Sequence, residues 1–158
     1  MLSSQIEQAL NTLVTRLNEI QLDGLAAFET VALAMPAVMD VTYMPAAYVL
    51  LDNDQVKMEN QYLEMHTLTV IISVFQIEDG TTGLTLSGAV YDALVSERTL
   101  GEKCGSLVVK KVNYVRTTLD TEIVIRAEIT LEFAIRYAPG KPAEAMLMQE
   151  INVKEEVT

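Results

Sequence analysis

The sequence has few of the residues on which most catalytic and metal sites depend. Its 158 residues include one cysteine, Cys104, one histidine, His66, and no tryptophan. One cysteine excludes an internal disulfide or a multi-cysteine metal site, and one histidine excludes a site with two imidazole ligands from the same chain. Gly83 to Gly88 has the glycine spacing of a phosphate loop, but Ala89 and Val90 replace the lysine and hydroxyl residue it requires. We therefore expect no cofactor and no metal.

Basic residues are also scarce. Eleven lysines and arginines stand against 22 acidic residues, giving a formal net charge of -11 and a pI near 4.4. Binding to nucleic acid or to an anionic membrane surface rests on a basic excess, so we expect neither partner. No apolar run approaches the roughly 20 residues that cross a bilayer, and the first residues lack the pattern of a secretion signal. We expect a soluble protein from a reducing compartment.

Half of the residues are hydrophobic, and their periodicity predicts one α+β domain. Helices are expected at 4–21 and 84–98, and strands at 25–34, 48–51, 63–77, 107–119 and 122–137. The order is α-β-β-β-α-β-β, which predicts a single domain over residues 1–137 with two main helices and a mixed, mostly antiparallel sheet. Residues 138–158 are expected to be a C-terminal tail that is flexible or ordered on assembly.

Local signals refine this prediction. Ser4 and Glu7 have the spacing of a capping box at the start of the first helix. Residues 63–77 are rich in β-branched side chains and apolar on both faces from Leu68 to Phe75, which predicts the central strand. Residues 122–137 show the clearest alternation of apolar and polar residues in the chain, which predicts one face in the core and one in water.

The polar segment after residue 51 is expected to be a loop. It places Asp52, Asp54 and Glu59 close together, which would suit cation binding or carboxylate catalysis. Val56 and Lys57 interrupt the calcium-loop pattern, so a solvated turn or a polar contact surface is the favoured interpretation.

Methionine is frequent in and near the irregular stretches. Such methionines either fill an uneven core or form an adaptable interface, and both interpretations stay open. The residues concerned are Met35, Met39, Met44, Met58 and Met65.

Four segments together carry a resemblance to a known family. They are Met44 to Leu51 (MPAAYVLL), Leu68 to Phe75 (LTVIISVF), Leu86 to Leu94 (LSGAVYDAL) and Ile129 to Tyr137 (ITLEFAIRY). In this order, over about residues 5–137, the chain resembles the tail terminator proteins of long-tailed bacteriophages and the related minor tail and neck proteins. The resemblance leaves residues 35–44 and 138–158 unexplained.

The resemblance implies a structural protein of the virion with no enzymatic activity. Such a protein forms a homo-oligomeric ring, commonly a hexamer, that caps the tail tube, ends its polymerisation and offers a surface for head-tail joining. Its partners would be copies of itself, the tail tube protein and a head-tail connector or neck protein. It would lie at the head-proximal end of the tail, and in the host cytoplasm during assembly. DNA would only pass through the channel, where an acidic lumen repels phosphates.

Exposure and composition suggest which residues contact a neighbouring subunit or partner. We expect these contacts in the polar loop and in the tail, at Asp52, Asp54, Gln55, Glu59, Met146 and Ile151.

Two alternatives remain. The first is another tail or neck component, such as a tube subunit or head-tail adaptor, which stacking into filaments would distinguish. The second is a small carboxylate-based enzyme or ligand-binding domain that uses Asp52, Asp54 and His66, which would require a pocket where those groups converge. A nucleophile and base formed by Cys104 and His66 is disfavoured, because no catalytic signature surrounds the cysteine.

Overall fold

The computed structural model describes residues 1–78, 82–100 and 105–139. The elements follow in the order α1 (Leu2–Asn18), β1 (Gln21–Leu22), β2 (Leu25–Ala26), β3 (Thr30–Ala32), a 3₁₀ turn (Val41–Tyr43), β4 (Ala46–Met58), β5 (Glu64–Ile77), α2 (Thr82–Ser96), β6 (Val108–Leu119) and β7 (Glu122–Tyr137). The predicted α+β class is confirmed. No helix among the described residues is long and apolar enough to span a membrane.

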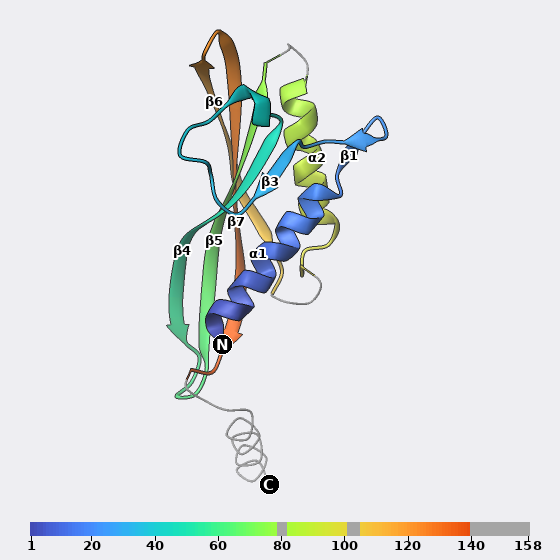
Figure 1. Cartoon of the computed structure of the whole chain (residues 1–158). Coiled ribbons are helices and arrows are strands. Elements are labelled where there is room, and N and C mark those ends of the chain that lie inside the picture. The colour runs from blue at the N-terminus through green and yellow to red at the C-terminus, as the bar shows by residue number, and fades with distance from the viewer. Residues whose placement is uncertain (79–81, 101–104, 140–158) are drawn as a thin grey trace.

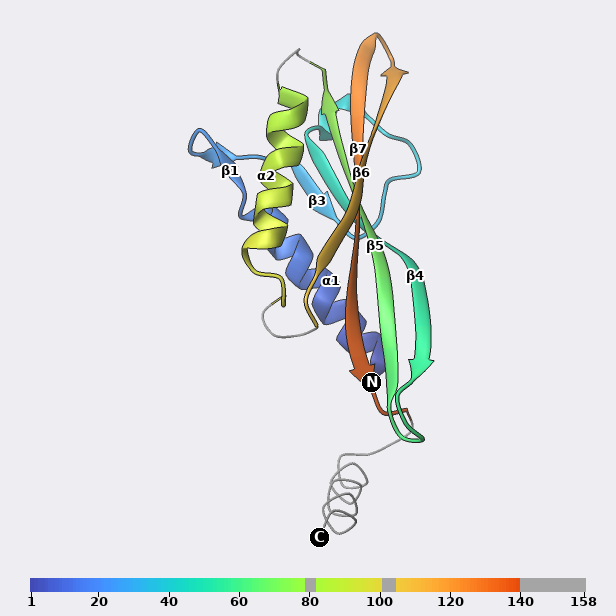
Figure 2. The ribbon, with the colours of Figure 1, turned by 180° about the vertical axis from the view of Figure 1, so that it is seen from behind.

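The main sheet has five strands in the order β3-β4-β5-β7-β6. β3 runs parallel to β4, and the other neighbours are antiparallel. The predicted central position of β5 is confirmed, as is the hairpin of the last two strands. The sheet is long and twisted, and α1 and α2 lie on the same face of it (Figures 1 and 2).

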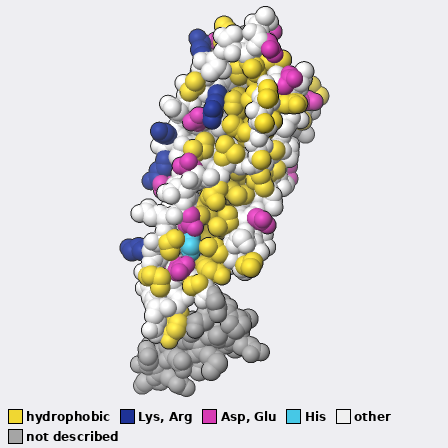
Figure 3. Space-filling model, turned by 60° about the vertical axis from the view of Figure 1, so that its left-hand side comes forward, with side chains coloured by type: hydrophobic (Ala, Val, Ile, Leu, Met, Phe, Trp, Pro, Cys, Tyr) yellow, Lys and Arg dark blue, Asp and Glu magenta, His cyan; other side chains and the backbone are white. Residues whose placement is uncertain are grey.

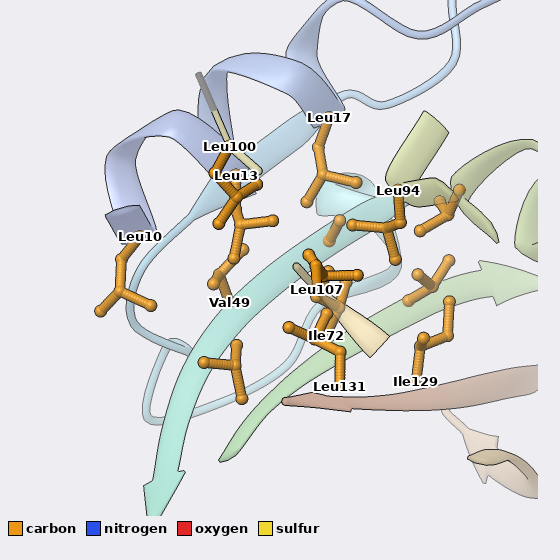
Figure 4. Packing of buried hydrophobic residues seen from close by; sticks show 14 of the residues in the cluster. Leu10, Leu13, Leu17, Val49, Ile72, Leu94, Leu100, Leu107, Ile129 and Leu131 are labelled. Atoms are coloured by element: carbon orange, nitrogen blue, oxygen red, sulfur yellow. The ribbon is translucent and has the colours of Figure 1, made fainter. Parts of the chain in front are cut away.

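The larger core lies between the two helices and the sheet (Figure 4). Alternate residues of β5 and β7 point toward the helices, so the alternating pattern of β7 has one buried face, as predicted. Each helix contributes an apolar stripe at three- and four-residue spacing. The fully or almost fully buried residues of this larger core include Leu13, Leu17, Val49, Leu68, Val70, Ile72, Val90, Leu94, Ile129 and Leu131. Burying a side chain of this size contributes about 1.5–3 kcal/mol.

A smaller core covers the opposite face at one end of the sheet. Tyr48 and Phe75 meet there edge to face, with ring centroids 5.9 Å apart. The connection between β3 and β4 folds over them and contributes Met35, Met39 and Met44 as partly buried side chains. These three methionines therefore fill an uneven core, which was one of the two open interpretations.

The first helix begins earlier than predicted. The N–H of Gln5 donates to the carbonyl oxygen of Met1 at 3.2 Å, so Ser4 lies inside the first turn of α1. The residue before the helix is Met1, which has no side-chain cap hydrogen bond. The predicted capping box of Ser4 and Glu7 is therefore wrong, because the helix extends upstream of it.

The strand predictions need two corrections. The segment 25–34 contains two short strands, β2 and β3, rather than one. The predicted loop at residues 52–58 is wrong, because β4 continues through it to Met58, which pairs with Glu64. Pairing with β5 satisfies the backbone groups on one side of this segment, and its polar side chains fit because this part of β4 is exposed.

Candidate functional site

The end of β4 and the start of β5 form a hairpin that continues the sheet at one end. We call residues 53–69 the β4–β5 hairpin, since Asn53 pairs with Thr69 and the pairing continues to the turn. In Figure 1 its turn lies below the N-terminus of α1. The Asn60 side chain closes the turn by accepting the N–H groups of Tyr62 and Leu63 at 2.8 and 2.9 Å.

A β-bulge decides which side chains of the hairpin face the helices. Leu51 pairs with Val70 and Asn53 with Thr69, so Asp52 is one extra residue in β4. An extra residue reverses the alternation of everything that follows it. Asp54 consequently lies opposite the core residue Leu68 and on the same face.

This reversal brings three ionisable side chains together. The Nδ1 of His66 lies 2.9 and 2.8 Å from the two carboxylate oxygens of Asp54. The Nε2 of His66 lies 2.8 Å from Oε2 of Glu64. His66 and Glu64 are two residues apart in β5, so the period of the strand places both on one face. Asp54 reaches them from β4, and the cluster therefore links two strands.

The two carboxylates favour the charged form of the His66 imidazole. His66 is only 4% exposed. Burial by itself lowers the pKa of His66, but the hydrogen bonds and charges of Asp54 and Glu64 outweigh it, so the pKa of His66 lies above its ordinary value. Both ring nitrogens face a carboxylate oxygen, and only the imidazolium has a proton to donate from each. Figure 3 shows the histidine between two acidic side chains within a band of hydrophobic ones.

A second ion pair lies on the other face of the same hairpin. Nε of Arg136 in β7 donates to Oε1 of Glu59 in the turn at 3.2 Å. This pair joins the turn to the end of β7, where Tyr137 pairs with Glu64. The Tyr137 ring also meets the His66 ring edge to face, at 6.2 Å between centroids.

Of the residues predicted to make contacts, four lie in the described part of the chain, and the structure does not gather them at one point. Asp54 binds His66 and Glu59 binds Arg136. Asp52 is the bulge, and Gln55 points to the face opposite Asp54. Met146 and Ile151 lie outside the described residues. Their roles as contact residues stay predictions.

Glu64 was missed by the sequence prediction. Its signal was the spacing Glu64-x-His66 in a predicted strand, which places a carboxylate beside the imidazole.

The cluster does not have the geometry of a catalytic or metal site. Each nitrogen of His66 already faces a carboxylate, so neither is free to accept a proton from a substrate. No group of three or more His, Cys, Asp or Glu among the described residues could hold a metal ion. Cys104, the other member of the disfavoured nucleophile and base pair, lies outside these residues.

Two clefts lie elsewhere on the molecule. One, of about 220 Å³, has a mostly apolar lining of Leu22, Ala27, Met44, Pro45, Gln76, Ile77 and Leu86. The other is a wide, shallow depression between α1 and α2 that includes Arg16, Glu19, Asp92 and Glu97. Neither contains Asp52, Asp54 or His66, so the groups proposed for an enzyme do not converge in these clefts.

On each side of the sheet a long strand has an edge without a neighbouring strand among the described residues. β3 pairs only with residues Ala46 to Tyr48, so from Val49 onward the outer side of β4 has no strand beside it within the described residues. β6 is the last strand on the other side, and its outer edge is likewise without a neighbouring strand there. The backbone N–H and C=O groups along such edges can pair with a strand from another chain.

The two edges differ in charge. β6 carries Lys110, Lys111 and Arg116 and no acidic residue, although the chain as a whole has a net charge of -11. The exposed part of β4 carries Asp52 and Asp54 against Lys57. β6 is therefore a basic edge on an acidic protein.

Comparisons with known proteins identify no family. No family model matches the chain, and no curated protein matches it. Among solved structures it is similar to a chain of the virion of a native gene transfer agent particle, with 14% identity and a TM-score of 0.41. That match covers 86% of this chain and 95% of the other. A TM-score at this level is too low to establish a shared fold.

Proposed function

We propose that this chain is a structural protein of a phage-like virion, and that it forms a closed ring in which the β4 edge of one copy pairs with the β6 edge of the next. The observation that carries the proposal is the pair of long, unlike edges on opposite sides of one sheet. In the ring, each subunit would donate one edge and accept the other.

Two unlike edges favour a ring over a symmetric dimer. A dimer with twofold symmetry joins identical surfaces, whereas a head-to-tail contact joins different ones and closes into a ring when the rotation permits. Lys110 and Arg116 form ion pairs with Glu132 and Glu78 of the same chain. Pairing β6 with β6 would still bring together two strands whose only charges are basic, whereas pairing β6 with β4 brings it beside a strand with Asp52, Asp54 and Lys57. The charge pattern thus disfavours the symmetric alternative.

The more specific role that we propose is that of a tail terminator, which caps the tail tube, ends its polymerisation and presents a surface to a connector or neck protein. It is supported by the element order that the resemblance is based on, which the structure reproduces with one added short hairpin, β1–β2. The acidic balance fits a channel that lets DNA pass without holding it. The similarity to the gene transfer agent chain agrees with a place in a virion but does not carry the proposal.

The oligomeric state tests the role. Native mass spectrometry over a concentration series, with negative-stain images of the large species, should give closed rings of one size. Filaments would instead indicate a tube subunit. A strict monomer at every concentration, also in the presence of tube protein, would contradict the ring.

Disulfide trapping tests the edge pairing. Gln55→Cys in β4 and Asn113→Cys in β6 lie on the same face of the sheet, and each is made in a Cys104→Ala background. On oxidation, a mixture of the two variants should give covalent dimers that neither variant gives alone. Asn53→Cys with Val115→Cys, and Lys57→Cys with Lys111→Cys, extend the scan along the same face in the antiparallel order that a continued sheet requires. Covalent dimers of a single variant would show a symmetric contact and overturn the proposed ring.

A further inference from the structure

We propose that Asp54, His66 and Glu64 form a proton-operated latch, which fastens β4 to β5 in the β4–β5 hairpin while the imidazole is charged and releases it when the proton is lost. The latch stands on the geometry of one chain and holds whether or not the chain forms a ring. It gives the cluster a regulatory role in place of a catalytic one.

The contacts of His66 depend on its charge. As an imidazolium, it donates one hydrogen bond across the strands to Asp54 and one along its own strand to Glu64. A neutral imidazole has one N–H and one lone pair, so one of the two carboxylates would face a lone pair. Because His66 is buried, water cannot readily take the place of the lost partner. Loss of one proton therefore breaks a buried contact and leaves two nearby carboxylates without their shared cation.

Among the residues that the structure describes, those that face His66 bring no other positive charge that could replace the proton. From β4 it is faced by Asp54, while Lys57 points to the opposite face. From β5 it is faced by Glu64, and from β7 by the neutral ring of Tyr137. Arg136 of β7 lies on the opposite face and binds Glu59.

At the start of α1 the charged groups are the amino terminus of Met1 and Glu7, whereas the charged groups that raise the pKa of His66 are Asp54 and Glu64.

The direction of the pH dependence follows from the raised pKa of His66. A group whose pKa is higher in the folded than in the unfolded chain adds stability that is complete below its unfolded pKa, about 6.5 for histidine. That stability is lost as the pH rises through the folded pKa. The latch is therefore closed at mildly acidic pH and opens toward alkaline pH. If β4 joins subunits as proposed above, ring formation acquires the same dependence.

The test follows His66 and the hairpin in the same dilute, full-length sample. His66 is the only histidine, so its ring signals in a proton NMR titration need no assignment. We expect its midpoint above the ordinary value. Amide exchange in residues 53–58, corrected for the intrinsic effect of pH, should quicken about tenfold or more across that midpoint. Exchange in the core of α1 should change much less.

Three variants separate the latch from general loss of stability. Asp54→Asn should lower the pKa of His66 and remove the pH step in exchange, and His66→Gln should leave exchange in the hairpin independent of pH. Glu59→Gln is the matched control, because it breaks the ion pair with Arg136 on the other face of the same hairpin. It should leave the His66 midpoint unchanged.

Two results would overturn the latch: exchange in the hairpin that stays flat through the titration of His66, or an unchanged midpoint in Asp54→Asn. Failure to form rings would count against the proposed function alone, since these measurements concern the isolated chain.

Discussion

Two buried serines differ in whether the side-chain hydroxyl has a hydrogen-bond partner, which determines how each contributes to stability. Ser73 in β5 is fully buried and its Oγ has no hydrogen-bond partner in the described part of the chain, whereas Oγ of Ser87 in α2 lies 3.0 Å from the Tyr114 hydroxyl. A buried polar group without a partner loses its hydration and gains nothing in return. The two residues therefore contribute to stability with opposite sign.

Replacing Ser73 by Ala should raise the free energy of unfolding by about 1 kcal/mol, because the exchange removes an unsatisfied hydroxyl and leaves little empty space. Urea denaturation of the wild type and the variant measures the change. Ser87→Ala is the control: it loses a hydrogen bond, and we expect no gain in stability. A Ser73→Ala variant less stable than the wild type would refute the prediction.

Among the elements, the bulge in β4 has the largest effect on the candidate site. Deleting Asp52 should make the pairs Leu51–Val70 and Asn53–Thr69 consecutive, which removes the bulge and leaves Asp54 opposite Leu68 and on the same face as His66. The pKa of His66 should then stay close to that of the wild type, as seen in the same NMR titration. Asp52→Ala keeps the extra residue and should likewise leave that pKa unchanged. A fall in the pKa of His66 in the deletion variant alone would show that Asp54 needs the bulge itself to reach His66.

The sequence predicted the bounds of a strand accurately where one residue pattern ran through the whole strand. The alternation of residues 122–137 and the β-branched run of 63–77 predicted β7 and β5 nearly to the residue, since each has a face whose burial fixes its register. It failed at Asp52 to Met58, where the polar composition of an exposed strand resembles that of a loop.

The candidate site was only partly predictable for a related reason. Asp54 and His66 were both singled out, but as loop and strand residues with separate roles. Their contact depends on a one-residue bulge, which has no signature in residue type. Glu64 could have been found from its spacing to His66, whereas the cross-strand partner could not.

At the scale of the whole molecule, the distribution of charge bears on assembly. Lys111 lies in the basic β6 edge and points to the face opposite the helices. Lys111→Glu should weaken ring formation by placing acidic side chains on both edges, with the loss greatest at low salt, where charges are screened least. Native mass spectrometry at two salt concentrations measures it. Lys57→Glu reverses a charge on the β4 edge instead. Because β6 is basic, we expect this variant to weaken ring formation less than Lys111→Glu does, or to strengthen it.

The C-terminal tail gives a second prediction at this scale. Deleting residues 143–158 should weaken assembly or partner joining, since the contacts expected at Met146 and Ile151 would be lost. The thermal transition of the remaining chain should stay close to that of the full chain, because the cores found in the described residues are formed without it. Circular dichroism on heating and native mass spectrometry together check this. Unchanged assembly would remove the tail from the proposed contacts.

The order of strands in the sheet also has a consequence for how the chain folds. β4 with β5, and β6 with β7, are each joined by a short turn, so both hairpins form from contacts that are local in sequence. β5 and β7 are separated in the sequence by α2 and β6, so their pairing closes a much longer loop. Closing that long loop costs more entropy than closing either hairpin, so we expect the rate of folding to be set where the two hairpins meet. Substitutions along that seam, such as Ile129→Val, should slow folding, whereas substitutions at the hairpin ends should mainly quicken unfolding.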